Sequence, residues 1–323
     1  MVITDLRMTE GEPRRFHEIE IPVPWGHVSG KWWGPRNKDP IIAIHGWQDN
    51  AGTFDNLAPL LPVELALLCI DLPGHGFSSH YPQGQYYYIW WDSLVLLRRV
   101  VLHLGLKRVS LLGHSLGGAV GFLYAATYPE TVDKLVSIDI VCPRVERPEI
   151  LVDQTKICID RYLKYESMAG ESVPCYDRKT MLNIVEDAYQ GSVSRDNCEV
   201  LMRRGMKPSP TDEDKYYFSR DARLKIAGLA QFSKDLVKAY ASKITCEYLN
   251  IRAEPGISFA YPELYDELLD TIKEKSAKFE YHKVKGSHHI HLEDASAVAD
   301  IIGKFFMSEP VEDLSNNLND LVV

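Results

Sequence analysis

Residues 109–129, VSLLGHSLGGAVGFLYAATYP, decide the fold of this 323-residue chain. The segment opens with a short aliphatic run typical of a buried strand, and a helical pattern follows that ends at Pro129. Between the two, Gly113 and Gly117 flank Ser115. Glycines at these positions let the backbone turn tightly and present a serine hydroxyl at the head of a helix. The strand, turn and helix together therefore predict that Ser115 is a nucleophile.

The flanking sequence continues the alternation of strands and helices. Short buried strands are predicted at residues 41–44, 65–70 and 135–138, and a helix is predicted at 86–104. Such alternation is typical of βαβ units that build a largely parallel sheet. The fold class indicated is therefore α/β.

The pattern changes after Asp139. Helical stretches replace strands, a turn or linker is predicted at 207–210, and strands return at 246–251 and 278–284. A final helix, capped by Asp294, follows the last strand. The predicted domains are a core of residues 1–142, a helical cap of residues 143–243, a second core part of residues 244–308 and a mobile acidic tail of residues 309–323.

The composition and charge of the chain disfavour some classes of function. The 36 Lys and Arg against 45 Asp and Glu give a net charge of −9, which disfavours a nucleic-acid partner. No run approaches about 18 apolar residues, so we expect no stable membrane insertion. Residues 1–16 lack a secretory leader pattern, and the six cysteines are scattered like reduced thiols. A cytoplasmic location is expected, with peroxisomal or vesicle-associated locations left open.

A serine hydroxyl needs a base, and the loop after the last predicted strand offers one. Residues 286–293 read GSHHIHLE, and a base on this loop can reach back over the sheet edge toward the serine. We expect His288 to be the base, with His289 and His291 as alternatives.

A tetrahedral intermediate needs fixed N–H donors for its oxyanion. The backbone N–H of Leu116, the residue after the predicted nucleophile, is one candidate. The other is the N–H of Trp47, because the strand at 41–44 ends in His45-Gly46-Trp47 and the glycine lets the chain turn.

The core motifs are HGWQDNA at 45–51, GHGFSSHY at 74–81, GHSLGG at 113–118 and VDKL at 132–135, joined in the cap by RRG at 203–205 and RDARL at 220–224. With them the chain resembles the serine-nucleophile branch of the α/β-hydrolase superfamily over residues 16–307. Within that branch it is most similar to the Kraken and serine-hydrolase-like proteins of animals. The resemblance implies a mostly parallel central sheet flanked by helices, with a helical cap inserted after the strand that ends at Asp139.

Two positions are candidates for the acid that completes the triad. Many superfamily members place an Asp after the strand that is here 246–251, but this chain has Glu254 in that region. Other members place the acid after the strand that follows the elbow helix, where Asp139 stands. We favour Asp139, keep Glu254 as the alternative and leave open that neither serves. Asp71, by the same resemblance, shapes a turn.

Together these residues predict a serine hydrolase that cleaves a small or medium apolar carboxylic ester or thioester through an acyl-enzyme, with no metal or organic cofactor. Aromatic residues around Tyr86–Trp91 and in the cap could line its pocket. Two alternatives remain at this stage. One is a small-ligand binding or receptor-like protein on the same fold, and the other is a hydrolase of carbon–carbon bonds.

Overall fold

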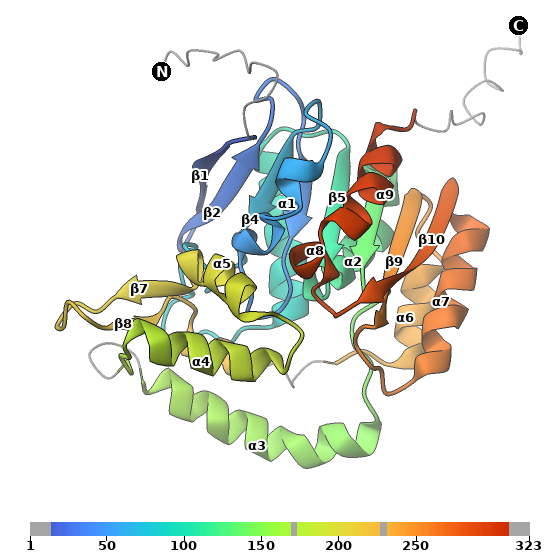
Figure 1. Ribbon diagram of the computed structural model, residues 1–323. Coiled ribbons are helices and arrows are strands. Elements are labelled where there is room, and N and C mark those ends of the chain that lie inside the picture. The colour runs from blue at the N-terminus through green and yellow to red at the C-terminus, as the bar shows by residue number, and fades with distance from the viewer. Residues whose placement is uncertain (1–13, 169–172, 227–230, 310–323) are drawn as a thin grey trace, which may run out of the picture.

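A central eight-stranded sheet organises the computed structural model, which describes residues 14–168, 173–226 and 231–309 (Figure 1). Its strand order is β1-β2-β4-β3-β5-β6-β9-β10. The pairs β1–β2 and β2–β4 are antiparallel, and every pair from β4 to β10 is parallel. The strands are β1 (Phe16–Val23), β2 (Gly26–Trp33), β3 (Ile41–Ile44), β4 (Leu67–Ile70), β5 (Val109–His114), β6 (Val132–Ile138), β9 (Glu247–Pro255) and β10 (Lys278–Gly286). The predicted α/β class with a mostly parallel sheet is confirmed.

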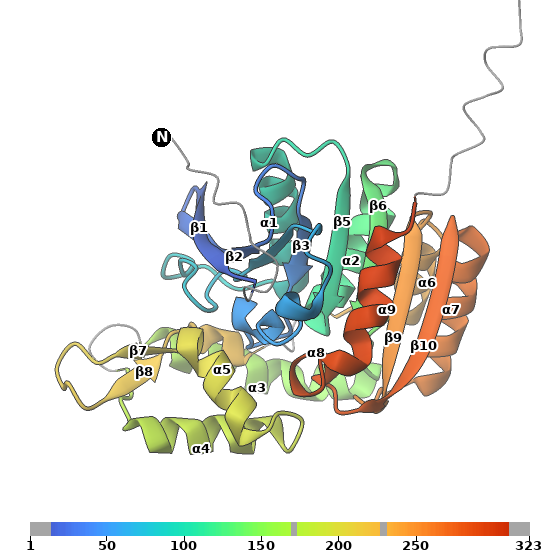
Figure 2. The ribbon, with the colours of Figure 1, turned by 45° about the horizontal axis from the view of Figure 1, so that its top comes forward.

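Two apolar cores lie on the two faces of this sheet. Side chains alternate along a strand, so in β3 Ile42 and Ile44 join one core while Ile41 and Ala43 join the other. The first core is covered by α1 (Ile89–His103), α2 (Leu116–Thr127), α6 (Lys234–Ala241) and α7 (Pro262–Lys275). The second is covered by α9 (Ser296–Met307), which lies in front of the sheet in Figure 2. The short helix α8 (Ile290–Glu293) precedes α9.

The elements from α3 to β8, which we call the cap, lie together below the sheet in Figure 1. They are α3 (Pro148–Glu166), α4 (Arg178–Tyr189), α5 (Arg195–Gly205), β7 (Met206–Pro208) and β8 (Tyr216–Phe218). The cap has its own small core around Met181 and Cys198, which Leu292 of α8 joins. A buried ion pair of 2.6 Å between Arg204 and Asp71 ties the cap to the sheet.

The structure differs from the predicted elements in several places. Residues 207–210 were expected to be a turn or linker, but β7 begins at Met206 and pairs with β8 in an antiparallel hairpin. The hairpin of β1 and β2 was not predicted either, because β1 is largely exposed and charged. The N-cap of the last helix is Ala295 and not the predicted Asp294, whose carboxylate accepts a hydrogen bond from the Ser296 hydroxyl at 2.7 Å. Helix α6, inside the range predicted as cap, packs with α2 and α7.

Residues 1–13 and 310–323 lie outside the described residues. These ranges contain most of the predicted acidic tail and most of the N-terminal segment 1–16, which was expected to lack a leader. Within the described ranges, no helix is long and apolar enough to cross a bilayer. All six cysteines are free, and four of them are buried.

Candidate active site

Ser115 sits on a strained corner between β5 and α2. Its backbone has φ 50° and ψ −117°, a conformation that L residues seldom adopt and that costs on the order of 1–3 kcal/mol. The neighbouring glycines permit the corner: a Cβ on Gly117 would lie 1.9 Å from the Ile44 carbonyl oxygen, and one on Gly113 would lie 2.3 Å from Gly117. The G-x-S-x-G spacing is therefore a steric requirement of this turn.

His288 and Asp139 are brought together from distant parts of the chain. Nδ1 of His288, in the loop after β10, lies 2.7 Å from Oδ2 of Asp139, the residue that follows β6. The carboxylate is fully buried. With Nδ1 engaged by a carboxylate, Nε2 is the ring nitrogen left to act on a neighbouring hydroxyl.

Several donors fix the Asp139 carboxylate. Oδ1 accepts from Nη1 of Arg252 at 2.8 Å and from the Ala253 N–H at 3.0 Å, while Oδ2 also accepts from the Ile257 N–H at 2.8 Å. Because Ile138 of β6 is in register with Ile251 of β9, the residues that follow these parallel strands meet at one sheet edge. A buried carboxylate that accepts hydrogen bonds from four donors is held in one orientation.

Ser115 and His288 line the same cavity, which has a volume of about 310 Å³. It lies between the sheet edge and the cap, and most of its other walls are apolar. The apolar lining residues are Trp47, Ile184, Val185, Ala188, Phe218 and Ile257.

The two predicted oxyanion donors lie next to this cavity. Leu116 is the first residue of α2, so its N–H has no carbonyl partner within the helix. Trp47 lines the cavity together with Gly46, while the next N–H along, that of Gln48, is engaged by Nε2 of His75 at 3.3 Å. The role of these two N–H groups as an oxyanion hole stays a prediction.

The alternative site residues take other positions. Glu254 belongs to β9 rather than to a loop, and its exposed carboxylate lies 3.4 Å from Nζ of Lys283. Asp71 accepts hydrogen bonds from the Phe77 N–H of its own turn and from the Ala51 N–H of the segment after β3, besides its ion pair with Arg204, in keeping with a structural role. His291 is buried against the Thr53 hydroxyl at 2.9 Å.

A buried polar cluster in the wall of the cavity was not anticipated from the sequence. Oδ2 of Asp49 lies 3.4 Å from Nε2 of His289 and 3.6 Å from Nδ1 of His114, and Oδ1 accepts from the Tyr189 hydroxyl at 2.6 Å. Ser192 and Nδ1 of His289 are 2.7 Å apart. The ligand atoms of Asp49, His114 and His289 lie within 4.8 Å of one another, a spacing that could accommodate a metal ion.

The protonation of this cluster follows from its burial. Burial lowers the pKa of His114 to about 3, and the nearby His288 ring adds to the effect. Neutral His114 donates from Nε2 to the His288 carbonyl oxygen at 2.9 Å, so it supports the loop that carries the proposed base. Burial alone raises the pKa of Asp49, but the neighbouring His289, the largest opposing cause, helps to hold that pKa well below its ordinary range.

The serine corner at the carboxyl edge of a mostly parallel sheet is the architecture of the α/β-hydrolases, and the comparisons agree. A family model described as alpha/beta hydrolase fold matches residues 39–162. The chain is 47% identical over 290 residues to a probable serine hydrolase of Drosophila melanogaster, covering 90% of this chain and 87% of that protein. It is 33% identical over 303 residues to the human serine hydrolase-like protein 2, covering 91% and 95%.

Solved structures extend the likeness. A hypothetical protein of Pseudomonas aeruginosa PAO1 superposes with a TM-score of 0.76 at 31% identity, covering 90% of this chain and 99% of that one. A thioesterase domain of the curacin biosynthetic pathway gives 0.74 at 20% identity, with 91% and 99% covered. The chain belongs to the serine hydrolase-like family of the α/β-hydrolase superfamily, which confirms the resemblance inferred from its motifs.

Proposed function

We propose that this serine hydrolase cleaves carboxylic esters or thioesters through an acyl-enzyme on Ser115. The observation that carries the proposal is the 2.7 Å contact between His288 and the buried Asp139, beside the cavity that both His288 and Ser115 line. A histidine fixed at Nδ1 by a carboxylate is oriented to remove the proton of a serine hydroxyl.

In the proposed reaction, Oγ of Ser115 attacks the carbonyl carbon while Nε2 of His288 takes the hydroxyl proton. The Leu116 and Trp47 N–H groups stabilise the oxyanion, and loss of one such donor costs about 2.7–4 kcal/mol of barrier. The intermediate collapses, the C–O or C–S bond breaks, and His288 protonates the leaving alcohol or thiol. Water, deprotonated by His288, then cleaves the acyl-enzyme and releases the acid.

The cavity supports a small or medium substrate. Its volume of about 310 Å³ is at the low end of pockets that bind small molecules, and its apolar walls suit an acyl chain or an aromatic alcohol. No step of this mechanism requires a metal or an organic cofactor. We also infer a reducing compartment such as the cytoplasm, because all six cysteines are free.

Hydrolysis of 4-nitrophenyl esters with acyl chains of two to twelve carbons tests the proposal. We expect turnover that falls for the longest chains and is lost in His288→Gln. A folded wild-type protein that hydrolyses none of these esters, or matching thioesters, would refute it. In that event, ligand-dependent thermal stabilisation would indicate a binding protein, and cleavage of a β-diketone would indicate carbon–carbon bond hydrolysis.

A further inference from the structure

A second cavity of about 370 Å³, which we call the cap cavity, lies between the cap and residues 80–83 and 220–225, and it adjoins the catalytic cavity. The two cavities share Ile184, Phe218 and Arg220 in their walls. A substrate with its carbonyl group at Ser115 can therefore extend past these three residues into the cap cavity.

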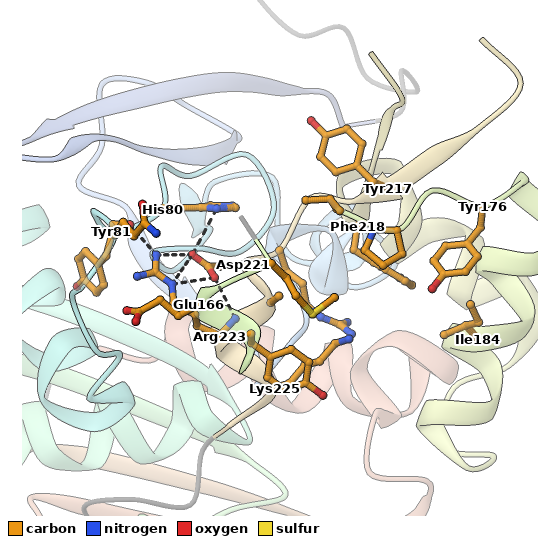
Figure 3. A pocket seen from close by; sticks show the side chains of 17 residues that line it. His80, Tyr81, Glu166, Tyr176, Ile184, Tyr217, Phe218, Asp221, Arg223 and Lys225 are labelled. Atoms are coloured by element: carbon orange, nitrogen blue, oxygen red, sulfur yellow. Dashed lines mark hydrogen bonds and ion pairs between the residues drawn. The ribbon is translucent and has the colours of Figure 1, made fainter. Parts of the chain in front are cut away.

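The acidic side chains of the cap cavity already have partners. Asp221 forms an ion pair with Arg223 at 2.7 Å and accepts from the Tyr87 hydroxyl at 3.0 Å. Glu166 accepts from the Tyr162 hydroxyl at 3.2 Å. Figure 3 shows Asp221, Arg223 and Glu166 gathered at one end of the cavity, while Tyr176 and Ile184 lie at the other.

Two cations of the same cavity lack such partners. Within the described ranges, no carboxylate forms an ion pair with Arg220 or Lys225, and Nε of Arg220 is buried without a hydrogen bond. The guanidinium carbon of Arg220 lies 4.9 Å from the centre of the Phe218 ring, and Nζ of Lys225 lies 5.0 Å from that of Tyr165.

Arg220 is half-buried in the wall shared by the two cavities, whereas Lys225 is exposed. Burial lowers the pKa of Arg220 although Tyr189 and the Asp49 carboxylate oppose the shift, and burial followed by the charge of Arg220 lowers the pKa of Lys225. A guanidinium keeps its charge at neutral pH and offers five donors in a fork that matches a carboxylate or a phosphate. The buried Nε of Arg220 has no hydrogen-bond partner, which is costly, and an anionic ligand would supply the missing acceptor.

We propose that Arg220, with Lys225 beside it, binds an anionic oxygen group of the substrate, so the natural substrate is an ester or thioester that bears a carboxylate or a phosphate. The inference rests on the proposed function, because it assumes that the reacting carbonyl lies at Ser115. It refines the expectation of an apolar ester: apolar walls surround the reacting bond, and a cationic wall binds one end of the molecule.

Pairs of esters that differ only in charge test the inference. One pair is mono-4-nitrophenyl glutarate and its methyl ester, which places the anion on the acyl side. Two further probes, 4-acetoxybenzoate and 4-acetoxyphenyl phosphate, place a carboxylate or a phosphate on the alcohol side, each compared with its neutral methyl or dimethyl ester. The readout is the ratio of kcat/KM for the anionic ester to that for its neutral partner.

We expect at least one anionic ester to be preferred by the wild type, and Arg220→Gln to lower that ratio by about 10- to 100-fold, as for loss of a charge-assisted hydrogen bond. Arg220→Lys keeps the charge without the fork and should give an intermediate ratio. Arg178→Gln is the matched control, since Arg178 is exposed and pairs with Glu199 at the surface. The probe with the largest ratio identifies the anion and the side that carries it.

A ratio near one for every pair, or ratios unchanged by Arg220→Gln, would overturn the inference while leaving the proposed function intact. If the wild type hydrolyses no ester, the proposed function fails, and calorimetric titration of the intact protein with glutarate and with inorganic phosphate decides the inference. Binding that Arg220→Gln abolishes would support it, and absence of binding to either anion would overturn it.

Discussion

Replacement of Asp139 by asparagine perturbs the centre of the proposed triad with almost no change in shape. Each carboxylate oxygen accepts two hydrogen bonds: Oδ1 from Arg252 and the Ala253 N–H, and Oδ2 from His288 and the Ile257 N–H. An amide turns one of these oxygens into an NH₂ donor. Whichever way the amide is oriented, donors then face donors at a fully buried site.

The effect on catalysis follows from the tautomer of His288. If the amide NH₂ faces Nδ1, the imidazole must protonate Nε2 and can no longer remove the proton of Ser115. The same change in a well-studied Ser-His-Asp triad lowers kcat by about 10⁴-fold, which corresponds to about 5.4 kcal/mol at 1.36 kcal/mol per decade. We expect a loss of similar size here. Folding should lose about 1–3 kcal/mol, because donors around residue 139 are left without an acceptor.

The measurement is the second-order rate of labelling by a fluorophosphonate, which reports serine activation without knowledge of the substrate, together with kcat/KM on 4-nitrophenyl butyrate. Circular dichroism and urea unfolding show whether the variant is folded. Glu254→Gln is the matched control, since it makes the same carboxylate-to-amide change at an exposed position, and it should stay within about 2-fold of wild type. Strong labelling by folded Asp139→Asn, with loss in Glu254→Gln, would refute the reasoning and identify Glu254 as the acid.

Two further predictions concern stability. Burial lowers the pKa of His114 from 6.5 to about 3, so between these values the unfolded chain binds more protons and the free energy of unfolding falls as pH drops below 6.5. His114 alone should cost about 2 kcal/mol between pH 6.5 and 5, and His45, His75 and His291, whose pKa values burial also lowers, add to it. Equal stability in urea at pH 7 and pH 5 would contradict this. Arg204→Ala removes the ion-pair partner of the buried Asp71 and should lower the free energy of unfolding by about 3–5 kcal/mol. Arg203→Ala, which changes the exposed neighbour of Arg204, should have little effect. Urea unfolding of both variants decides the point, and equal losses would show that the ion pair contributes nothing specific.

The parts of the fold that the sequence predicts well are those set by local patterns. The short aliphatic strands β3 and β5 are buried on both faces, so a continuous apolar run identifies them. The corner at Ser115 is predictable because the turn leaves no room for a Cβ at Gly113 or Gly117, and both glycines lie within two residues of the serine. Predictions failed where the pattern was ambiguous, as in β7, whose Lys207 and Pro208 resemble a turn.

The rest of the candidate site depends on contacts between distant segments. The partnership of Asp139 with Arg252 requires β6 and β9 to be neighbours, and no local pattern states which strands pair. The available signal was that an acidic residue follows each of two predicted strands. This signal did not decide whether Asp139 or Glu254 is the acid of the triad. Asp49 and Arg220 acquire their roles only when the cap lies over the sheet edge, which brings α4 and β8 to the cavity.

The central claim is that Ser115 is an activated nucleophile. Its most direct test is intact mass spectrometry of the wild type and of Ser115→Ala after incubation with a fluorophosphonate, with peptide mapping of the adduct and Ser110→Ala as the control. We predict one adduct per wild-type chain, located on Ser115, retained in Ser110→Ala and absent from folded Ser115→Ala. An unlabelled, folded wild type, or an adduct that persists in Ser115→Ala, would contradict the claim.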